Sequence, residues 1–263
     1  MAYKFCANLN FMFREAPLLT DRFSLAAKYG FKAIECGNPY EHSVSELIAV
    51  KEATGIEVIL INTPTDVDRK QYGFAALATE SNQDFLNGIM KSIEYANALN
   101  CSQIHIMSGI VNEPNLKNFE SMVCNLKLAQ PYLDKYNITG LIEPINSHSL
   151  PNYYLNNYDT ALNILKEVNS NNLKLMLDIF HLQQIAGDLT FNIKRFLPYT
   201  GHIQIAQVPK RHEPDTFGEI DYKYIFQLLK EVNYSKYIGL EYIPEENTTK
   251  GLKWIEKFGF RLM

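Results

Sequence analysis

The segment LDKYNITGLIE, residues 133–143, contains the pattern that best indicates the fold. A helical stretch ends near Asn137, a residue type that tolerates the positive φ found where helices end. The apolar run that follows is continuous rather than alternating, which is typical of a strand covered on both faces. The strand ends at Glu143, and Pro144 prevents its simple continuation. The segment therefore predicts a helix, a turn and a buried strand that delivers a carboxylate.

The same unit recurs along the chain, with turns at residues such as Gly30 and Gly55. The further copies are AAKYGFKAIE, KEATGIEVILIN, NALNCSQIHIM, EVNSNNLKLMLD, YTGHIQIA and EVNYSKYIGLE, and YKFCANLN opens the series. Helices are predicted near 21–29, 43–54, 81–99, 115–136, 157–168, 189–196, 221–231 and 247–257, and N-caps at Asp21, Ser81 and Asp221. Eight βα units in 263 residues predict one (β/α)8 TIM-barrel domain over 1–263. The alternative, a doubly wound sheet, normally has a glycine-rich phosphate loop that ANLNFMF lacks.

The composition argues against several classes of protein. The net charge of −4 gives no sign of a nucleic-acid or anionic membrane partner. No run approaches the roughly 18 apolar residues of a membrane span. The four cysteines form no C-x-x-C pair, and the first residues show no signal peptide. We therefore expect a cytoplasmic protein with a small-molecule substrate. The oligomeric state stays open, a homo-oligomer included.

Polar side chains lie at the carboxyl end of every predicted strand, where sites form in parallel α/β folds. They are Asn8, Glu35, Asn62, His105, Glu143, Asp178, Gln204 and Glu241. The carboxylates of Glu143, Asp178 and Glu241 would repel one another at one barrel mouth, and a divalent cation would remove that repulsion. Gln204 can add an amide oxygen. This set of ligands suits Mg²⁺ or Mn²⁺.

Structural interpretations of several polar residues remain open. Glu35 can be a helix-capping or solvated loop residue, and His105 can be a neutral core histidine. His181, just past the sixth predicted strand, can donate a hydrogen bond to a substrate oxygen or cap and pack the next helix. Lys210 and Arg211 belong to a long charged loop. That loop is either a solvated face or an anion clamp, because a guanidinium can bind a carboxylate through two hydrogen bonds.

Motifs along nearly the whole chain are similar to those of one family. They are ANLNFMF, DRFSLAAKYGFKAIE, NTP, EPIN, DIFHLQ, GHIQIAQVPKRHEPDTFGEIDY, GLEYIP and TTKGLKW. The chain resembles the hydroxypyruvate isomerases and the related 2-oxotetronate isomerases of the xylose-isomerase-like barrel superfamily. The resemblance implies a metal held by the four ligands named above. It also implies that Glu143 and Glu241 exchange protons with the substrate and that His181 and Arg211 contact it. Lys210 and His105 complete the expected substrate-binding residues.

The resemblance implies the conversion of hydroxypyruvate to 2-hydroxy-3-oxopropanoate through an enediolate. A 2-oxotetronate isomerase or a ketose epimerase would use the same metal and glutamates. The segment ECGNPY, residues 35–40, departs from the bulkier apolar residues expected before PY and would alter the pocket wall. An abasic-site endonuclease is a remote alternative, because it needs several metal ions and a basic face for DNA. A non-catalytic sugar-acid binding protein is the last alternative.

Overall fold

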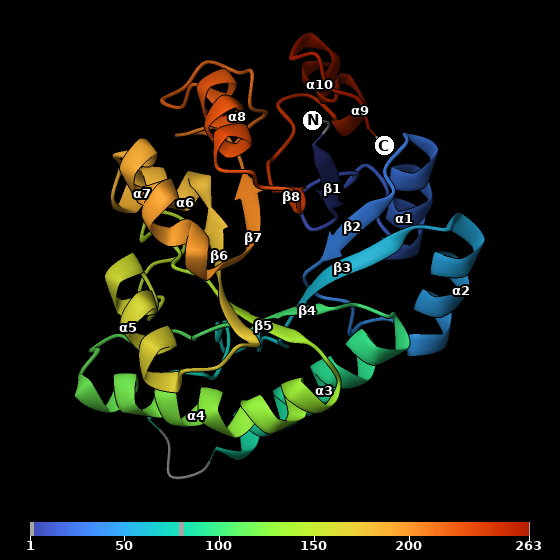
Figure 1. Ribbon diagram of the computed structural model, residues 1–263. Helices are drawn as coiled ribbons and strands as arrows, with labels where there is room; N and C mark the ends of the chain where they lie inside the picture. Colours follow the sequence, from blue (N-terminus) through green and yellow to red (C-terminus); the bar gives the residue numbers. More distant parts are fainter. Residues whose placement is uncertain (1–2, 79–81, 263) are drawn as a thin grey trace.

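Eight short parallel strands close into a barrel in the computed structural model, which describes residues 3–78 and 82–262 (Figure 1). The strands are β1 (Lys4–Asn8), β2 (Ala33–Cys36), β3 (Glu57–Asn62), β4 (Gln103–His105), β5 (Thr139–Ile142), β6 (Leu173–Asp178), β7 (Thr200–Ile205) and β8 (Tyr237–Leu240). They pair in chain order, and β1 pairs with β8, with Cys6 opposite Gly239. The predicted (β/α)8 barrel is confirmed, and the doubly wound alternative is wrong.

Helices surround the strands, with two differences from the predicted pattern (Figure 1). They are α1 (Leu19–Lys28), α2 (Val44–Thr54), α3 (Gln83–Ala98), α4 (Leu116–Lys135), α5 (Tyr158–Val168), α6 (Ile179–Ile185), α7 (Leu189–Phe196), η1 (a 3-10 turn, Leu197–Tyr199), α8 (Tyr222–Glu231), α9 (Thr248–Gly251) and α10 (Lys253–Lys257). Helix α6 is additional, and the predicted helix over 247–257 is two short helices. Within the described residues, none of these helices combines the length and apolar character that crossing a bilayer requires.

The predicted N-caps have three different outcomes. Asp221 caps α8, because its carboxylate accepts hydrogen bonds from two backbone N–H groups of the first turn. Asp21 is not a cap: α1 begins at Leu19, and Asp21 lies inside its first turn, where a negative charge still favours the helix dipole. Ser81 lies outside the described residues. The predicted turn residue Asn137 has a φ of 53°, as expected.

The barrel interior contains a small apolar cluster as well as polar side chains. Leu60, Leu141 and Met176 form a small apolar cluster that is separate from the large core between strands and helices. Side chains two residues apart on a strand point to the same face. Asp178 therefore faces the interior like Met176. The apolar cluster lies beside buried polar side chains, because Leu60 is in register with Glu35 and Met176 with His202.

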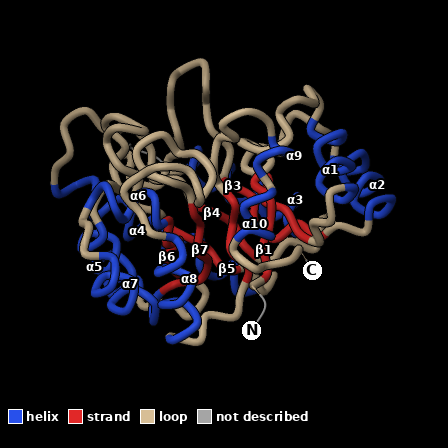
Figure 2. Tube along the Cα trace, turned by 90° about the horizontal axis from the view of Figure 1, so that it is seen from above, coloured by secondary structure: helices blue, strands red, loops and turns tan. Residues whose placement is uncertain are grey.

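The segments that follow the strands include the longest connections, and these loops gather on one side of the strands (Figure 2). The segment 206–221 between β7 and α8 is one example, and 143–157 between β5 and α5 is another. Sites in this architecture form on the same side, at the carboxyl ends of the strands. The fold therefore provides one mouth at which side chains from distant parts of the chain meet.

Candidate active site

Four acidic and histidine side chains meet at the carboxyl ends of β5, β6 and β8. Glu143 directly follows β5, Asp178 ends β6, His181 lies in α6 and Glu241 directly follows β8. One ligand atom from each lies within 4.8 Å of the others. Three of the four predicted metal ligands are therefore brought together, and His181 joins them.

Gln204, the fourth predicted ligand, is buried in β7 and presents an unused oxygen. Its Nε2 donates to Glu35 Oε2 over 2.6 Å. Within the described residues, Gln204 Oε1 and Glu143 Oε1 are buried atoms without a hydrogen-bond partner. Buried polar atoms are almost always satisfied, so two unpaired oxygens beside carboxylates need an explanation. A hard divalent cation takes oxygen ligands of this kind, and the residues present fit it.

Burial and mutual repulsion change the acidity of the clustered carboxyl groups. Burial raises the pKa of Glu143 well above its ordinary value, and the charges of Glu241 and Asp178 add to the effect. Burial also raises the pKa of Glu241 to about 8, although Arg211 opposes this shift. The carboxyl groups therefore do not ionise together readily without an added positive charge. Perturbed acids in one cluster are typical of functional sites.

The hydrogen bonds of His181 determine where its proton lies. The backbone N–H of Asn146 donates to His181 Nδ1 over 3.3 Å, and the side-chain amide of Asn146 lies 2.6 Å from the same atom. Because Nδ1 accepts, the proton of the neutral ring lies on Nε2. His181 Nε2 is 3.5 Å from Asp178 Oδ2, and burial holds the pKa of His181 well below its ordinary value. His181 is therefore a neutral donor facing the cluster.

Arg211 reaches the cluster from the loop after β7. Its Nη2 lies 2.5 Å from Glu241 Oε2 and 3.4 Å from Asp178 Oδ2. The guanidinium is held between the rings of Phe11 and Phe180, with centroids 4.6 and 4.8 Å away. Stacking between two rings limits how far such a group can move. Arg211 is thus a fixed positive charge at the site.

His105 and Lys210 have contrasting positions. His105 is buried at the end of β4, with its Nε2 3.7 Å from Glu143 Oε2. Burial lowers the pKa of His105 to about 3, so the ring is neutral at pH 7. Lys210 is exposed, and within the described residues it forms no hydrogen bond or ion pair. The structure therefore brings His105 to the cluster and leaves Lys210 outside it.

Residues 23–258 match the family model described as a xylose isomerase-like TIM barrel. The chain belongs to this family. A Danio rerio protein provisionally named a hydroxypyruvate isomerase is 44% identical, covering 97% of this chain and 95% of its own. A 2-oxo-tetronate isomerase of Cupriavidus necator is 39% identical, covering 97% of this chain and 98% of its own.

A solved structure is similar over almost the same length. A crystal structure titled AP endonuclease, family 2, from Brucella melitensis has a TM-score of 0.93 and 35% sequence identity, covering 98% of this chain and 99% of that one. Among xylose isomerase-like barrels, the curated relatives at 37–44% identity over nearly their full length are named as isomerases. This member of the family is an isomerase.

Sequence reasoning missed one group of buried residues in this xylose isomerase-like barrel. Glu35 is neither a cap nor a solvated residue: it is fully buried, and His202 Nε2 lies 2.5 Å from its Oε1. A signal for His202 was present, because it lies two residues before Gln204 on the same strand and so shares its face. Glu35 offered no such signal, since a single acid near a strand end is common.

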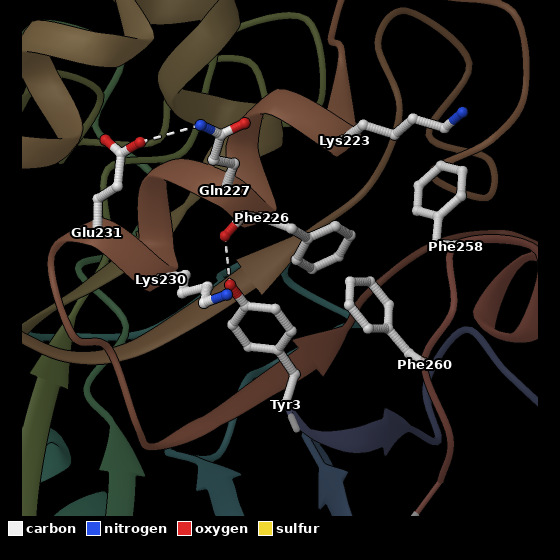
Figure 3. A pocket seen from close by; sticks show the side chains of 8 residues that line it. All are labelled: Tyr3, Lys223, Phe226, Gln227, Lys230, Glu231, Phe258 and Phe260. Carbon is white, nitrogen blue, oxygen red and sulfur yellow. Dashed lines mark hydrogen bonds between the residues drawn. The ribbon is translucent and has the colours of Figure 1, made fainter. Parts of the chain in front are cut away.

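A cavity of about 650 Å³ lies away from the cluster at the barrel mouth (Figure 3). It is lined by Tyr3, Lys223, Phe226, Gln227, Lys230, Glu231, Phe258 and Phe260. Tyr3 directly precedes the start of β1, so the cavity includes the amino end of a strand. Figure 3 shows aromatic rings around this space, and the Tyr3 hydroxyl donates a hydrogen bond to the Phe226 carbonyl. Its lining contains one carboxylate, so it does not offer the paired acids of the barrel mouth.

Proposed function

We propose that the protein isomerises a small hydroxy-oxo acid with the help of Mg²⁺ or Mn²⁺, and that hydroxypyruvate is the first substrate to test. The observation that carries the proposal is the meeting of the buried Glu143 and the partly buried Glu241 with Asp178 and a neutral histidine donor. Two such groups can transfer a proton between adjacent carbons, because one accepts a proton while the other delivers one. Relatives named for hydroxypyruvate and for 2-oxo-tetronate support an acid substrate.

The reaction moves a carbonyl by one carbon. Carbon 3 of hydroxypyruvate loses a proton, carbon 2 gains one, and the hydroxyl proton passes from oxygen 3 to oxygen 2. Glu143 and Glu241 suit the two carbon steps, because one can accept a proton while the other delivers one. Each such step typically contributes about 10²–10⁴-fold to the rate. A bound divalent cation would stabilise the negative charge that develops on the substrate oxygens.

Two further side chains suit substrate recognition. The Nε2–H of His181 can donate to a substrate oxygen, because its other nitrogen is already occupied by Asn146. Arg211 provides a positive charge held between two aromatic rings, and a guanidinium binds carboxylates well. Lys210 lies outside the cluster, so we place it at most at the rim of the substrate site.

2-Oxotetronate isomerisation is the second candidate, supported by the named Cupriavidus relative. The metal ligands and glutamates would be the same, and only the pocket dimensions would differ. We do not propose cleavage of abasic DNA, although the Brucella structure carries an endonuclease title. That reaction needs a basic binding face, and this chain has a net charge of −4.

The proposal is tested by measuring turnover of the metal-free and the Mg²⁺-loaded protein. Hydroxypyruvate, 2-oxotetronate, a neutral ketose and an abasic oligonucleotide are offered separately. We expect conversion of one acid that depends on Mg²⁺, with kcat/KM for the ketose lower by roughly tenfold or more. Conversion without metal, a preference for the ketose, or cleavage of the oligonucleotide would each overturn the proposal.

A further inference from the structure

The carboxylate of Glu35 lies at the centre of a buried hydrogen-bond network inside the barrel. Glu35 comes from β2, and its side chain is fully buried. Within the described residues, four side-chain groups lie within hydrogen-bond distance of it. They are Asn8 Nδ2 at 2.9 Å, Gln204 Nε2 at 2.6 Å, His202 Nε2 at 2.5 Å and Cys6 Sγ at 3.4 Å. Glu35 thus links β1, β2 and β7 below the barrel mouth.

The two amides and the thiol donate to Glu35, and His202 donates in the tautomer that carries its proton on Nε2. Oε2 accepts from the two amides, and Oε1 accepts from the imidazole and the thiol. An ionised carboxylate is an acceptor only, and it satisfies this arrangement without a proton of its own.

The first consequence concerns the side-chain amide of Gln204. An amide has a donor end and an acceptor end, and only the donor end can face an acceptor-only carboxylate. Glu35 therefore holds the Gln204 nitrogen and turns the oxygen away from itself. That oxygen, Oε1, is one of the buried atoms without a hydrogen-bond partner in the described residues. The orientation needed for a cation ligand is thus set by Glu35.

The second consequence concerns Asn8 and Glu241. The backbone N–H of Asn10 donates to Asn8 Oδ1 over 3.0 Å, which leaves the Asn8 nitrogen to face inward. Asn8 Nδ2 then donates to Glu35 Oε2 and, over 3.1 Å, to Glu241 Oε1. Asn8 therefore bridges the buried carboxylate and one of the two glutamates proposed to move protons.

The neighbouring strand leaves room for this network. A Cβ atom placed on Gly239 of β8 would lie 1.9 Å from Glu35 Oε1 and 2.8 Å from Gln204 Cγ. Contacts this short do not occur between a Cβ atom and an atom that is not bonded to it. Glycine has no Cβ, so it allows the Glu35 side chain to approach the β8 backbone closely. The position of the Glu35 carboxylate therefore depends on the missing side chain at 239.

We propose that Glu35 is a positioning residue that orients the Gln204 oxygen as a cation ligand and, through Asn8, holds Glu241 in place. The inference rests on the proposed function, because it assigns a role in the same metal site. An alternative role for Glu35 is as a ligand in a second metal site with Cys6 and His202, because ligand atoms of these three residues also lie close together. His202 and Glu35 are in direct hydrogen-bond contact at 2.5 Å, which leaves no space for an ion between them.

The test measures the Kd and stoichiometry of Mn²⁺ binding by calorimetry, together with the thermal unfolding temperature. Glu35→Gln is compared with Cys6→Ala as a matched control, because Cys6 contacts the same carboxylate but neither Gln204 nor Glu241. Loss of a residue that orients a metal ligand typically weakens metal binding by about 10–100-fold. We expect that loss in Glu35→Gln, a Kd within about twofold of wild type in Cys6→Ala, and one Mn²⁺ per chain.

Two results would overturn the positioning role. One is a folded Glu35→Gln protein that binds Mn²⁺ like the wild type and loses only thermal stability. The other is a second Mn²⁺ per chain that is lost in Glu35→Gln. If Glu35→Gln does not fold, Asn8→Ala tests the Glu241 branch: a lower kcat with an unchanged fold supports the proposal, and wild-type kcat contradicts it. Wild-type Mn²⁺ binding without isomerisation would refute the proposed function alone.

Discussion

Glu143 and Glu241 are the residues on which the proposed chemistry depends most. Both lie in the barrel mouth, and burial is the main cause of their raised pKa values. Glu143→Gln and Glu241→Gln keep the shape of each side chain but remove its capacity to exchange protons. We expect each variant to lower kcat by at least about 10³-fold, within the range of lost general acid–base catalysis. Circular dichroism checks the fold, and wild-type kcat in either folded variant would refute its role.

Arg211 provides a second test at the residue scale. It contacts Glu241 and Asp178 and is stacked between two rings, so it can both position the site and bind an anion. We expect Arg211→Ala to raise KM for an acid substrate much more than for a neutral sugar analogue. Lys210→Ala is the matched control, because Lys210 is exposed and should leave both KM values unchanged. Equal effects of Arg211→Ala on the two substrates would argue against a carboxylate contact.

At the element scale, Asp178 joins a strand, a helix and the site. It ends β6 and caps α6, since its Oδ1 accepts from the backbone N–H of Phe180 over 2.9 Å. Asparagine caps helices about as well as aspartate, but it is a poorer ligand for a hard cation. We therefore expect Asp178→Asn to unfold at nearly the wild-type temperature while binding Mn²⁺ more weakly. A large loss of thermal stability would show that the carboxylate acts mainly in folding.

The strands were more predictable than the helices that follow them. Continuous apolar runs that end in a polar residue indicated all eight strands, because a strand buried on both faces consists mainly of apolar residues. Helix α6 was missed because Ile179–Ile185 begins directly after Asp178, with no glycine or proline between strand and helix. The start of α1 was placed late because Leu19 precedes the Asp21 that resembles a cap. Local signals of this kind are weak at element boundaries.

The site was predictable where chemistry alone singles out a residue type. Three acids at strand ends were recognised because burying them together is costly without a cation. The role of Asn146 in fixing the His181 tautomer could not be foreseen, since it depends on a contact between the loop after β5 and helix α6. The exposure of Lys210 beside the inward-facing Arg211 was equally unpredictable, because it depends on the path of the loop after β7.

At the scale of the whole molecule, the closed barrel brings several acids together in a largely buried site. This arrangement predicts that cation binding depends on pH. Without a cation, the raised pKa of Glu143 and that of Glu241, about 8, keep protons on these groups near neutrality. A cation must displace those protons, so its Kd should fall as the pH rises from about 6 to about 8. Calorimetry in buffers of different ionisation enthalpy measures the released protons. A Kd that does not change over this range would contradict these pKa shifts.

The proposed function of the barrel mouth is to move a proton between adjacent carbons of a hydroxy-oxo acid. Its most direct test is proton NMR of the product formed from hydroxypyruvate in D₂O by the Mg²⁺-loaded protein, with the metal-free protein as control. We predict Mg²⁺-dependent 2-hydroxy-3-oxopropanoate that carries solvent deuterium on carbon 2, because glutamate carboxyl groups exchange with water. Product that forms without deuterium would indicate a hydride shift or a shielded proton, and it would contradict exchange through Glu143 and Glu241.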